Sequence, residues 1–314
     1  MRNLQLLWII CLFGISACGG NASPVGTTDP GILTSTTFLA DITRNIAGDR
    51  VPVESLLPIG ADPHSYQPTP RDAAKIADSE LLIINGAGYE SFIESLLDNA
   101  GGERHVIIAS DGIEPRHMED HEGEDHDENA EAGNGHEHEA GDPHMWLDPN
   151  NVIIYVENIR EALTNLDPEG GAIYKSNADA YVAELKSLDA WIIEQVAQIP
   201  QEKRLLVTNH EALGYFAERY GFTIAGTVIE SFSSGASPSA GQMAGLIDQI
   251  KTSGAPAIFL DASDNDTLAQ QIADETSVRV VTGLHLESLT DGPPAGTYID
   301  LMLHNVMLIV DALK

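Results

Sequence analysis

The sequence predicts an α/β protein with two similar lobes, each built on a parallel sheet flanked by helices, and one long helix that joins them. Short apolar runs alternate with helix-like segments in both halves of the chain. Alternation of this density indicates a parallel sheet that helices cover on both faces. One amphipathic stretch between the halves is longer than a crossover helix needs to be. The 314 residues suffice for two ordinary domains or one large domain.

The N-terminus carries the features of a secretory signal. Arg2 precedes an apolar run over residues 4–15, which is too short to span a bilayer comfortably. Ile15-Ser16-Ala17-Cys18 resembles the lipobox of bacterial lipoproteins, so we expect a signal peptide over 1–17, a lipidated Cys18 and a tether over 18–31. An ordinary cleaved signal is the alternative and would leave Cys18 as a free thiol. The only other cysteine would leave with the signal, so no disulfide supports the mature fold and no thiolate is available as a metal ligand.

The charge balance excludes one class of partner. The chain is 43% hydrophobic and 20% charged, as soluble proteins usually are, but its formal net charge is −32. Nucleic acid binding requires a basic surface, so we expect no nucleic acid partner. The excess of acidic groups is compatible with attracting cations, although part of it serves only solubility.

Residues 32–168 predict the N-terminal lobe. The short apolar runs have the length of buried strands, and the segments between them have apolar residues at helical spacing. The predicted strands are 32–39, 51–57, 81–85 and 106–109, and the predicted helices are 41–47, 69–77, 89–100 and 149–166.

Residues 169–200 predict the joining helix. From Tyr174 to Ile199, apolar residues recur at steps of three and four, and neither Gly nor Pro interrupts them before Pro200. A helix of about 25 residues is ~38 Å long. That length suits a spine between two lobes; a long surface helix is the alternative.

Residues 201–314 repeat the plan of the first half and predict the C-terminal lobe. Apolar runs again alternate with segments of helical periodicity. The predicted strands are 205–208, 223–228, 257–260 and 278–282, and the predicted helices are 212–220, 240–253, 267–276 and 297–313.

The segment 117–141 has an unusual composition, with five histidines, ten carboxylates and neither Lys nor Arg. Such a segment cannot bury a core, so we expect a solvated, disordered loop, and histidine-rich tracts of this kind are typical of metal collection. The loop either binds zinc weakly and passes it to a tighter site, contributes to a second site, or is a solvated linker without a role. Its accessory histidines are His117, His121, His126, His136 and His138.

Four further side chains suit a fixed metal site. In open α/β sheets, ligands bind beyond the carboxyl ends of the strands. Two candidates come from each half of the chain, so a site that uses all of them would lie in the cleft between the lobes. These candidates are His64 and His144, each in an Asp-Pro-His sequence, His210 at the end of strand 205–208, and Glu287 beyond strand 278–282.

Three motifs resemble the ligand motifs of the zinc/manganese substrate-binding proteins of bacterial ABC transporters, a metal-binding lipoprotein family, in its zinc-uptake type with a His-rich loop. They are GADPHSYQPTP (60–70), DPHMWLDP (142–149) and NHEALGYFAERYGF (209–222). The similarity runs from about residue 32 to residue 314 and includes GTYIDLMLHN (296–305). It implies an extracytoplasmic, lipid-anchored monomer that captures Zn²⁺, less readily Mn²⁺, and delivers it to a membrane permease.

The resemblance also implies a ligand set. His64, His144 and His210 would bind through imidazole nitrogen, and the fourth family ligand is usually an Asp before Ser-Leu. Glu287 occupies that place here and is one methylene longer. Asp261, at the end of strand 257–260, and His285 are therefore competing candidates.

The chemistry of these residues favours zinc. Three imidazoles and a carboxylate suit tetrahedral Zn²⁺, whereas Mn²⁺ prefers more oxygen ligands. Asp62 and Asp142, which begin the two Asp-Pro-His sequences, are candidates to orient the imidazoles, unless they only form turns.

Two other functions remain open from the residues. A zinc hydrolase would leave the fourth metal position to water, and the sequence contains neither H-E-x-x-H nor a nucleophile elbow. A surface adhesin with a structural metal is the third alternative, and the sequence does not distinguish an adhesive surface from an acidic one.

Overall fold

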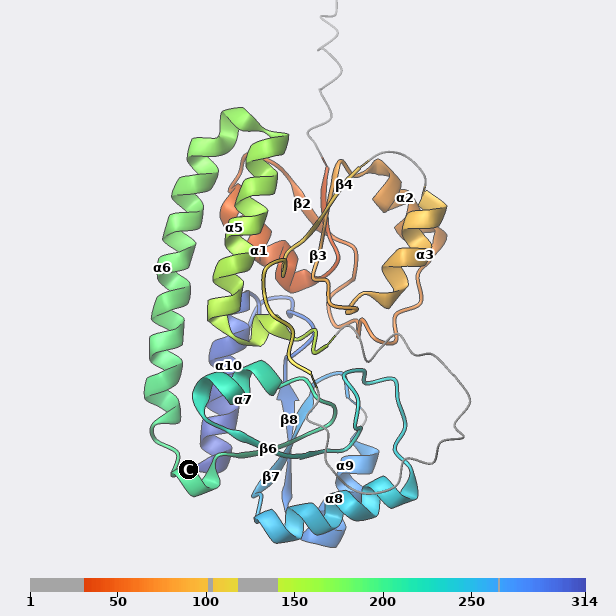
Figure 1. Cartoon of the computed structure of the whole chain (residues 1–314), viewed down its shortest axis with the longest axis vertical. Coiled ribbons are helices and arrows are strands. Elements are labelled where there is room, and N and C mark those ends of the chain that lie inside the picture. The colour runs from red at the N-terminus through yellow and green to blue at the C-terminus, as the bar shows by residue number, and fades with distance from the viewer. Residues whose placement is uncertain (1–30, 101–103, 118–140, 265) are drawn as a thin grey trace, which may run out of the picture.

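A computed structural model describes residues 31–100, 104–117, 141–264 and 266–314. It confirms two α/β lobes with four-stranded parallel sheets and a long joining helix. Figure 1 shows the lobes one above the other, with α6 along one side of both. The expected signal peptide, Cys18, the tether and residues 118–140 of the His-rich loop lie outside the described residues.

The N-terminal sheet has the strand order β2-β1-β3-β4 and is parallel throughout. The predicted strand 32–39 was too long, because helix α1 begins at Thr37. The Thr36 side chain accepts a hydrogen bond from the Leu39 N–H and so caps the helix. The elements are β1 (Ile32–Thr34), α1 (Thr37–Ala47), β2 (Val53–Ser55), α2 (Pro70–Asp78), β3 (Leu81–Ile84), α3 (Ser91–Ala100) and β4 (His105–Ile108).

The C-terminal sheet repeats this plan with the order β6-β5-β7-β8, again parallel. Its elements lie within two residues of the predicted ones. They are β5 (Leu205–Thr208), α7 (Gly214–Tyr220), β6 (Thr223–Thr227), α8 (Ala240–Ser253), β7 (Ala257–Asp261), α9 (Thr267–Thr276), β8 (Arg279–Leu284) and α10 (Tyr298–Leu313).

Three elements connect the lobes. The short 3-10 helix η1 (Met145–Leu147) leads into α5 (Pro149–Leu166), and α6 (Gly171–Val196) follows. Helix α6 has 26 residues and packs against α1, α5, α7 and α10, which belong to different parts of the two lobes.

One continuous apolar core runs through both lobes and the joining helix. It includes Phe38 from α1, Leu185 from α6 and Val306 from α10. Because the lobes share this core, free hinge motion between them would expose apolar surface. In the part of the chain that the structure describes, no helix is both long and apolar enough to cross a membrane.

Candidate metal centre

The four candidate ligands converge between the lobes. His64 lies in the loop after β2, His144 directly precedes η1, His210 follows β5, and Glu287 follows β8. The carboxyl ends of the parallel strands in both sheets therefore supply the site, as the topology requires. One ligand atom from each residue lies within 4.8 Å of the others.

The distances within this cluster suit a metal ion. Glu287 Oε1 lies 3.2 Å from His210 Nε2 and 3.3 Å from His144 Nε2. A tetrahedral zinc site with bonds of about 2.0–2.2 Å places its ligand atoms about 3.3–3.6 Å apart. His64 Nε2 is farther away, 4.0 Å from Glu287 Oε2. Three ligands are thus close to their final spacing, and His64 needs a small movement.

Two nitrogen atoms of the cluster are buried without a hydrogen-bond partner among the described residues. They are Nε2 of His64 and Nε2 of His144. Buried polar atoms are rarely left unpaired, because losing water without a new partner is unfavourable. A divalent cation bound to these two nitrogens, with the Nε2 proton of His144 released, would satisfy both atoms. The donor set therefore fits a divalent metal ion.

The two Asp-Pro-His sequences position their histidines differently. Asp142 accepts hydrogen bonds from the His144 N–H and from ring nitrogen Nδ1, at 3.0 and 2.9 Å. This contact leaves Nε2 to face the metal. Asp62 accepts a bond from the backbone N–H of His64, at 2.9 Å, and none from its ring among the described residues. Its other donors are Ser65 Oγ, at 2.9 Å, and Ser234 Oγ of the other lobe, at 2.7 Å. Asp142 thus orients the imidazole ring of His144, whereas Asp62 holds the backbone of the loop that carries His64.

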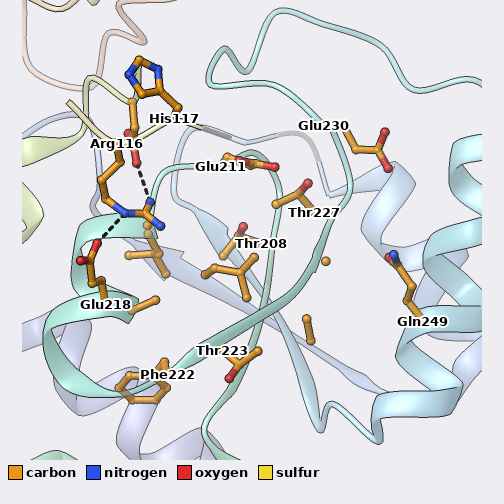
Figure 2. Close-up of a pocket in the computed structure, with 17 residues that line it drawn as sticks. Arg116, His117, Thr208, Glu211, Glu218, Phe222, Thr223, Thr227, Glu230 and Gln249 are labelled. Atoms are coloured by element: carbon orange, nitrogen blue, oxygen red, sulfur yellow. Dashed lines mark hydrogen bonds and ion pairs between the residues drawn. The ribbon is translucent and has the colours of Figure 1, made fainter. Parts of the chain in front are cut away.

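A cavity of about 570 Å³ lies beside the centre and reaches Asp142 (Figure 2). Arg116 forms ion pairs there with Asp142 and Glu218, at 3.3 and 2.8 Å. A Cβ at Gly214 would overlap the Arg116 guanidinium, so the glycine of the third motif is needed for this pair. His117, the one described histidine of the acidic segment, is exposed and lines the cavity, apart from the four ligands.

Neither competing candidate joins the cluster. Asp261 accepts hydrogen bonds from the N–H of Ser263 and from the N–H of Leu286, at 2.7 and 2.5 Å. It therefore positions the residue before Glu287 and does not face the metal. The His285 ring lies against the ring of His304, with centroids 5.4 Å apart.

Tyr89 is a site residue that sequence reasoning missed. It follows β3, and its hydroxyl donates a hydrogen bond to Glu287 Oε2 at 2.5 Å. Its ring meets the His64 ring edge-on, with centroids 5.3 Å apart. Tyr89 therefore holds the carboxylate oxygen that faces away from His144 and His210. Its place at the carboxyl end of a strand was the available signal, but the sequence does not show which strand end meets Glu287.

Charge compensation links the ligands electrostatically. Burial alone would lower the pKa of His144, but the Glu287 charge and the hydrogen bond to Asp142 outweigh burial and raise that pKa to about 9. Burial raises the pKa of Glu287, yet the nearby charge of His144 and the hydrogen bond from His210 outweigh burial and bring it well below its usual value. Burial and the neighbouring imidazoles lower the pKa of His64 to about 4.

Comparison with known proteins now identifies the family. Residues 32–312 match the sequence model of the ZnuA family, described as zinc-uptake complex component A, periplasmic. The chain belongs to this family. ZnuA-family proteins are solute-binding components of uptake systems, so the zinc hydrolase is not supported.

Individual relatives cover nearly the whole chain. The manganese-binding lipoprotein MntA of Halalkalibacterium halodurans is 33% identical over 319 residues, which cover 100% of both chains. The iron-binding protein YfeA of Yersinia pestis is 34% identical over 272 residues, 86% of this chain and 82% of YfeA.

Solved structures of similar proteins share the fold. The Mn-bound periplasmic metal-binding protein of Candidatus Liberibacter asiaticus matches with a TM-score of 0.77 and 31% identity, covering 91% of this chain and 100% of that chain. The periplasmic zinc-binding protein TroA of Treponema pallidum matches with a TM-score of 0.78 and 28% identity, covering 91% of this chain and 99% of that chain.

Metal binding at pH 7 should release about one proton, because His144 must lose its Nε2 proton before it can bind a metal. With a pKa of about 9, His144 is protonated at pH 7, and His64 is neutral. Affinity should therefore rise as the pH increases from 7 to 9. Calorimetry in buffers of different ionisation enthalpy measures the proton count. In Asp142→Asn the count should fall; a count of zero in the wild type would contradict the assignment.

Tyr89→Phe should weaken metal binding by about tenfold, the lower end of what loss of an outer-shell partner causes. The substitution removes the donor that holds Glu287 Oε2 and leaves the aromatic packing in place. Competition with a chromophoric chelator measures the change. Tyr174→Phe is the matched control, because the Tyr174 hydroxyl bonds Asp167, away from the ligands. Equal affinities for the wild type and Tyr89→Phe would remove Tyr89 from the site.

Proposed function

We propose that this protein is the extracytoplasmic solute-binding component of an ABC transporter, and that it captures Zn²⁺ and delivers it to a membrane permease. The observation that carries the proposal is the closed set of four protein ligands between the lobes. A carrier fills the metal's coordination positions with protein, whereas a catalytic zinc site keeps one position open for water. Family membership supports the same role.

The ligand chemistry supports zinc as the cargo. Three imidazoles and one carboxylate oxygen match the tetrahedral preference of Zn²⁺. Tyr89 holds the second oxygen of Glu287, which favours a carboxylate that binds through one oxygen only. Zinc also exceeds manganese in intrinsic affinity for such a donor set.

Manganese is the second candidate, and the comparisons favour it. MntA is named for manganese, and the Liberibacter metal-binding protein has been solved with Mn and also with Cd bound. TroA is named for zinc and YfeA for iron. Binding of Mn²⁺ would require more oxygen ligands, which Glu287 could supply only by turning Oε2 away from Tyr89 towards the metal. The distances to the imidazoles would then have to adjust as well.

The location and partners follow from the same proposal. A signal peptide over 1–17 and a lipid on Cys18 would hold the domain at the outer face of a membrane through the tether 18–31. Relatives such as MntA are named as lipoproteins, which supports such an anchor. The permease is the protein partner, and the carrier is expected to act as a monomer.

Metal analysis tests the cargo directly. Purified wild-type protein should hold one zinc ion per chain and bind Zn²⁺ more tightly than Mn²⁺. His144→Ala should lose this ion, because it removes one imidazole and the partner of Asp142. His105→Ala, on the exposed strand β4, is the matched control and should keep it. Equal or tighter binding of Mn²⁺ would favour the second candidate instead.

Deletion of residues 119–139 should leave the tight site intact and remove only weaker zinc binding. The two ends of the acidic segment already meet, because the Asp142 N–H donates to the Arg116 carbonyl at 2.6 Å. A short connection can therefore replace the segment without moving His144. Isothermal titration should show one tight site in both proteins and additional weak sites in the wild type alone. Unchanged stoichiometry would contradict a metal-collecting role for the loop.

A further inference from the structure

We propose that Trp146 is a positioning residue that ties the loop of His144 to the loop of Glu287 and so sets the separation of these two ligands before metal arrives. The inference rests on the proposed function of the four-residue cluster as the metal site. It goes further by naming the contact that holds ligands from different lobes together.

The indole N–H of Trp146 makes this connection. Trp146 lies two residues after His144 in η1, and its Nε1 donates a hydrogen bond to the Leu286 carbonyl at 3.0 Å. Leu286 directly precedes Glu287, and the two bonded residues are 140 positions apart in the chain. The Trp146 side chain therefore joins the loop that carries His144 to the backbone directly before Glu287.

The indole has little freedom to leave this position. Trp146 is 0% exposed, and its ring stacks on Phe38 with centroids 4.4 Å apart and an interplanar angle of 23°. Tyr89 and His144 pack on it as well, with centroid distances of 4.8 and 5.3 Å. A ring packed on several sides fixes the direction of its only donor.

The peptide groups at both ends of this bond are also held. The Trp146 carbonyl accepts a hydrogen bond from the Tyr298 hydroxyl at 2.6 Å, so α10 anchors the indole's own backbone. Leu286, whose carbonyl accepts from Trp146, also donates its N–H to Asp261 Oδ2, at 2.5 Å. The backbone that leads into Glu287 is therefore fixed at its N–H by Asp261 and at its carbonyl by Trp146.

The loop of His64 is tied to the C-terminal lobe by more accessible hydrogen bonds. There, Ser234 of the C-terminal lobe bonds Asp62, and Gly60 bonds Ser288, at partly buried or exposed positions where water can compete. His64, next to Asp62, is also the ligand farthest from Glu287. The link between the His144 and Glu287 loops is therefore buried, whereas these two links of the His64 loop are open to competition from water.

Trp146→Phe tests the connection, because it keeps an aromatic ring on Phe38 and removes the N–H. Zinc affinity should fall 10- to 100-fold, the range for lost outer-shell partners. The absorption spectrum of bound Co²⁺, which reports coordination geometry, should change too. Trp191→Phe on α6 is the matched control, since Trp191 is only partly buried and packs on the core away from the ligand loops. It should leave both measurements unchanged.

The outcomes separate the two levels of inference. If wild-type protein binds neither Zn²⁺ nor Co²⁺, the proposed function fails. If wild type binds both and Trp146→Phe keeps the same affinity and Co²⁺ spectrum, Trp146 only packs and the positioning role is overturned, even where the metal-free protein melts earlier. Should Trp146→Phe not fold, Tyr298→Phe decides, because it loosens the Trp146 backbone. A smaller fall in affinity supports the role, and no change overturns it.

Discussion

A buried carboxylate among three imidazoles is the constraint on which the site depends. Glu287 is only 4% exposed, so its charge requires a positive partner close by. Without metal, that partner is the protonated His144, whose pKa Glu287 raises. A divalent cation takes the place of this proton at nearly the same point. Both states can therefore share nearly one arrangement of the ligands, and binding replaces a proton with a divalent cation, which adds one net positive charge.

The architecture supplies this point by setting two parallel sheets end to end. The carboxyl ends of β2, β5 and β8 each deliver one ligand, and the connection into α5 delivers the fourth. The lobes could not do this if they moved freely, and the shared core with α6 holds them together. Cross-lobe hydrogen bonds, such as the bond from Trp146 to Leu286, then hold the loops that carry the ligands in place. The core provides the energy of association, and the polar contacts provide the geometry.

Much of this was readable from the sequence, and the remainder has a common cause. Periodicity located the elements, and the motifs identified the three histidines, because both are local properties of the chain. The strand 32–39 was misjudged since one capping side chain at Thr36 outweighed β-branched composition. The contacts of Tyr89, Trp146 and Asp261 could not be read from the sequence, because each involves a partner far away in the chain. Even two identical Asp-Pro-His sequences differ in role, as only the second is fully buried.

The preference between metals then follows from the second oxygen of one carboxylate. The three imidazoles alone suit several divalent ions, so they do little to discriminate between metals. If Glu287 binds through Oε1 alone, the metal has four ligands and zinc is favoured. If both Glu287 oxygens bind, the metal has five ligand atoms and one more oxygen, which is closer to the oxygen-rich coordination that manganese prefers. Tyr89 holds Oε2, and Trp146 holds the backbone on which Glu287 is mounted, so the carboxylate cannot easily rotate. Contacts outside the ligand set thus decide which oxygen of Glu287 is free to reach a metal.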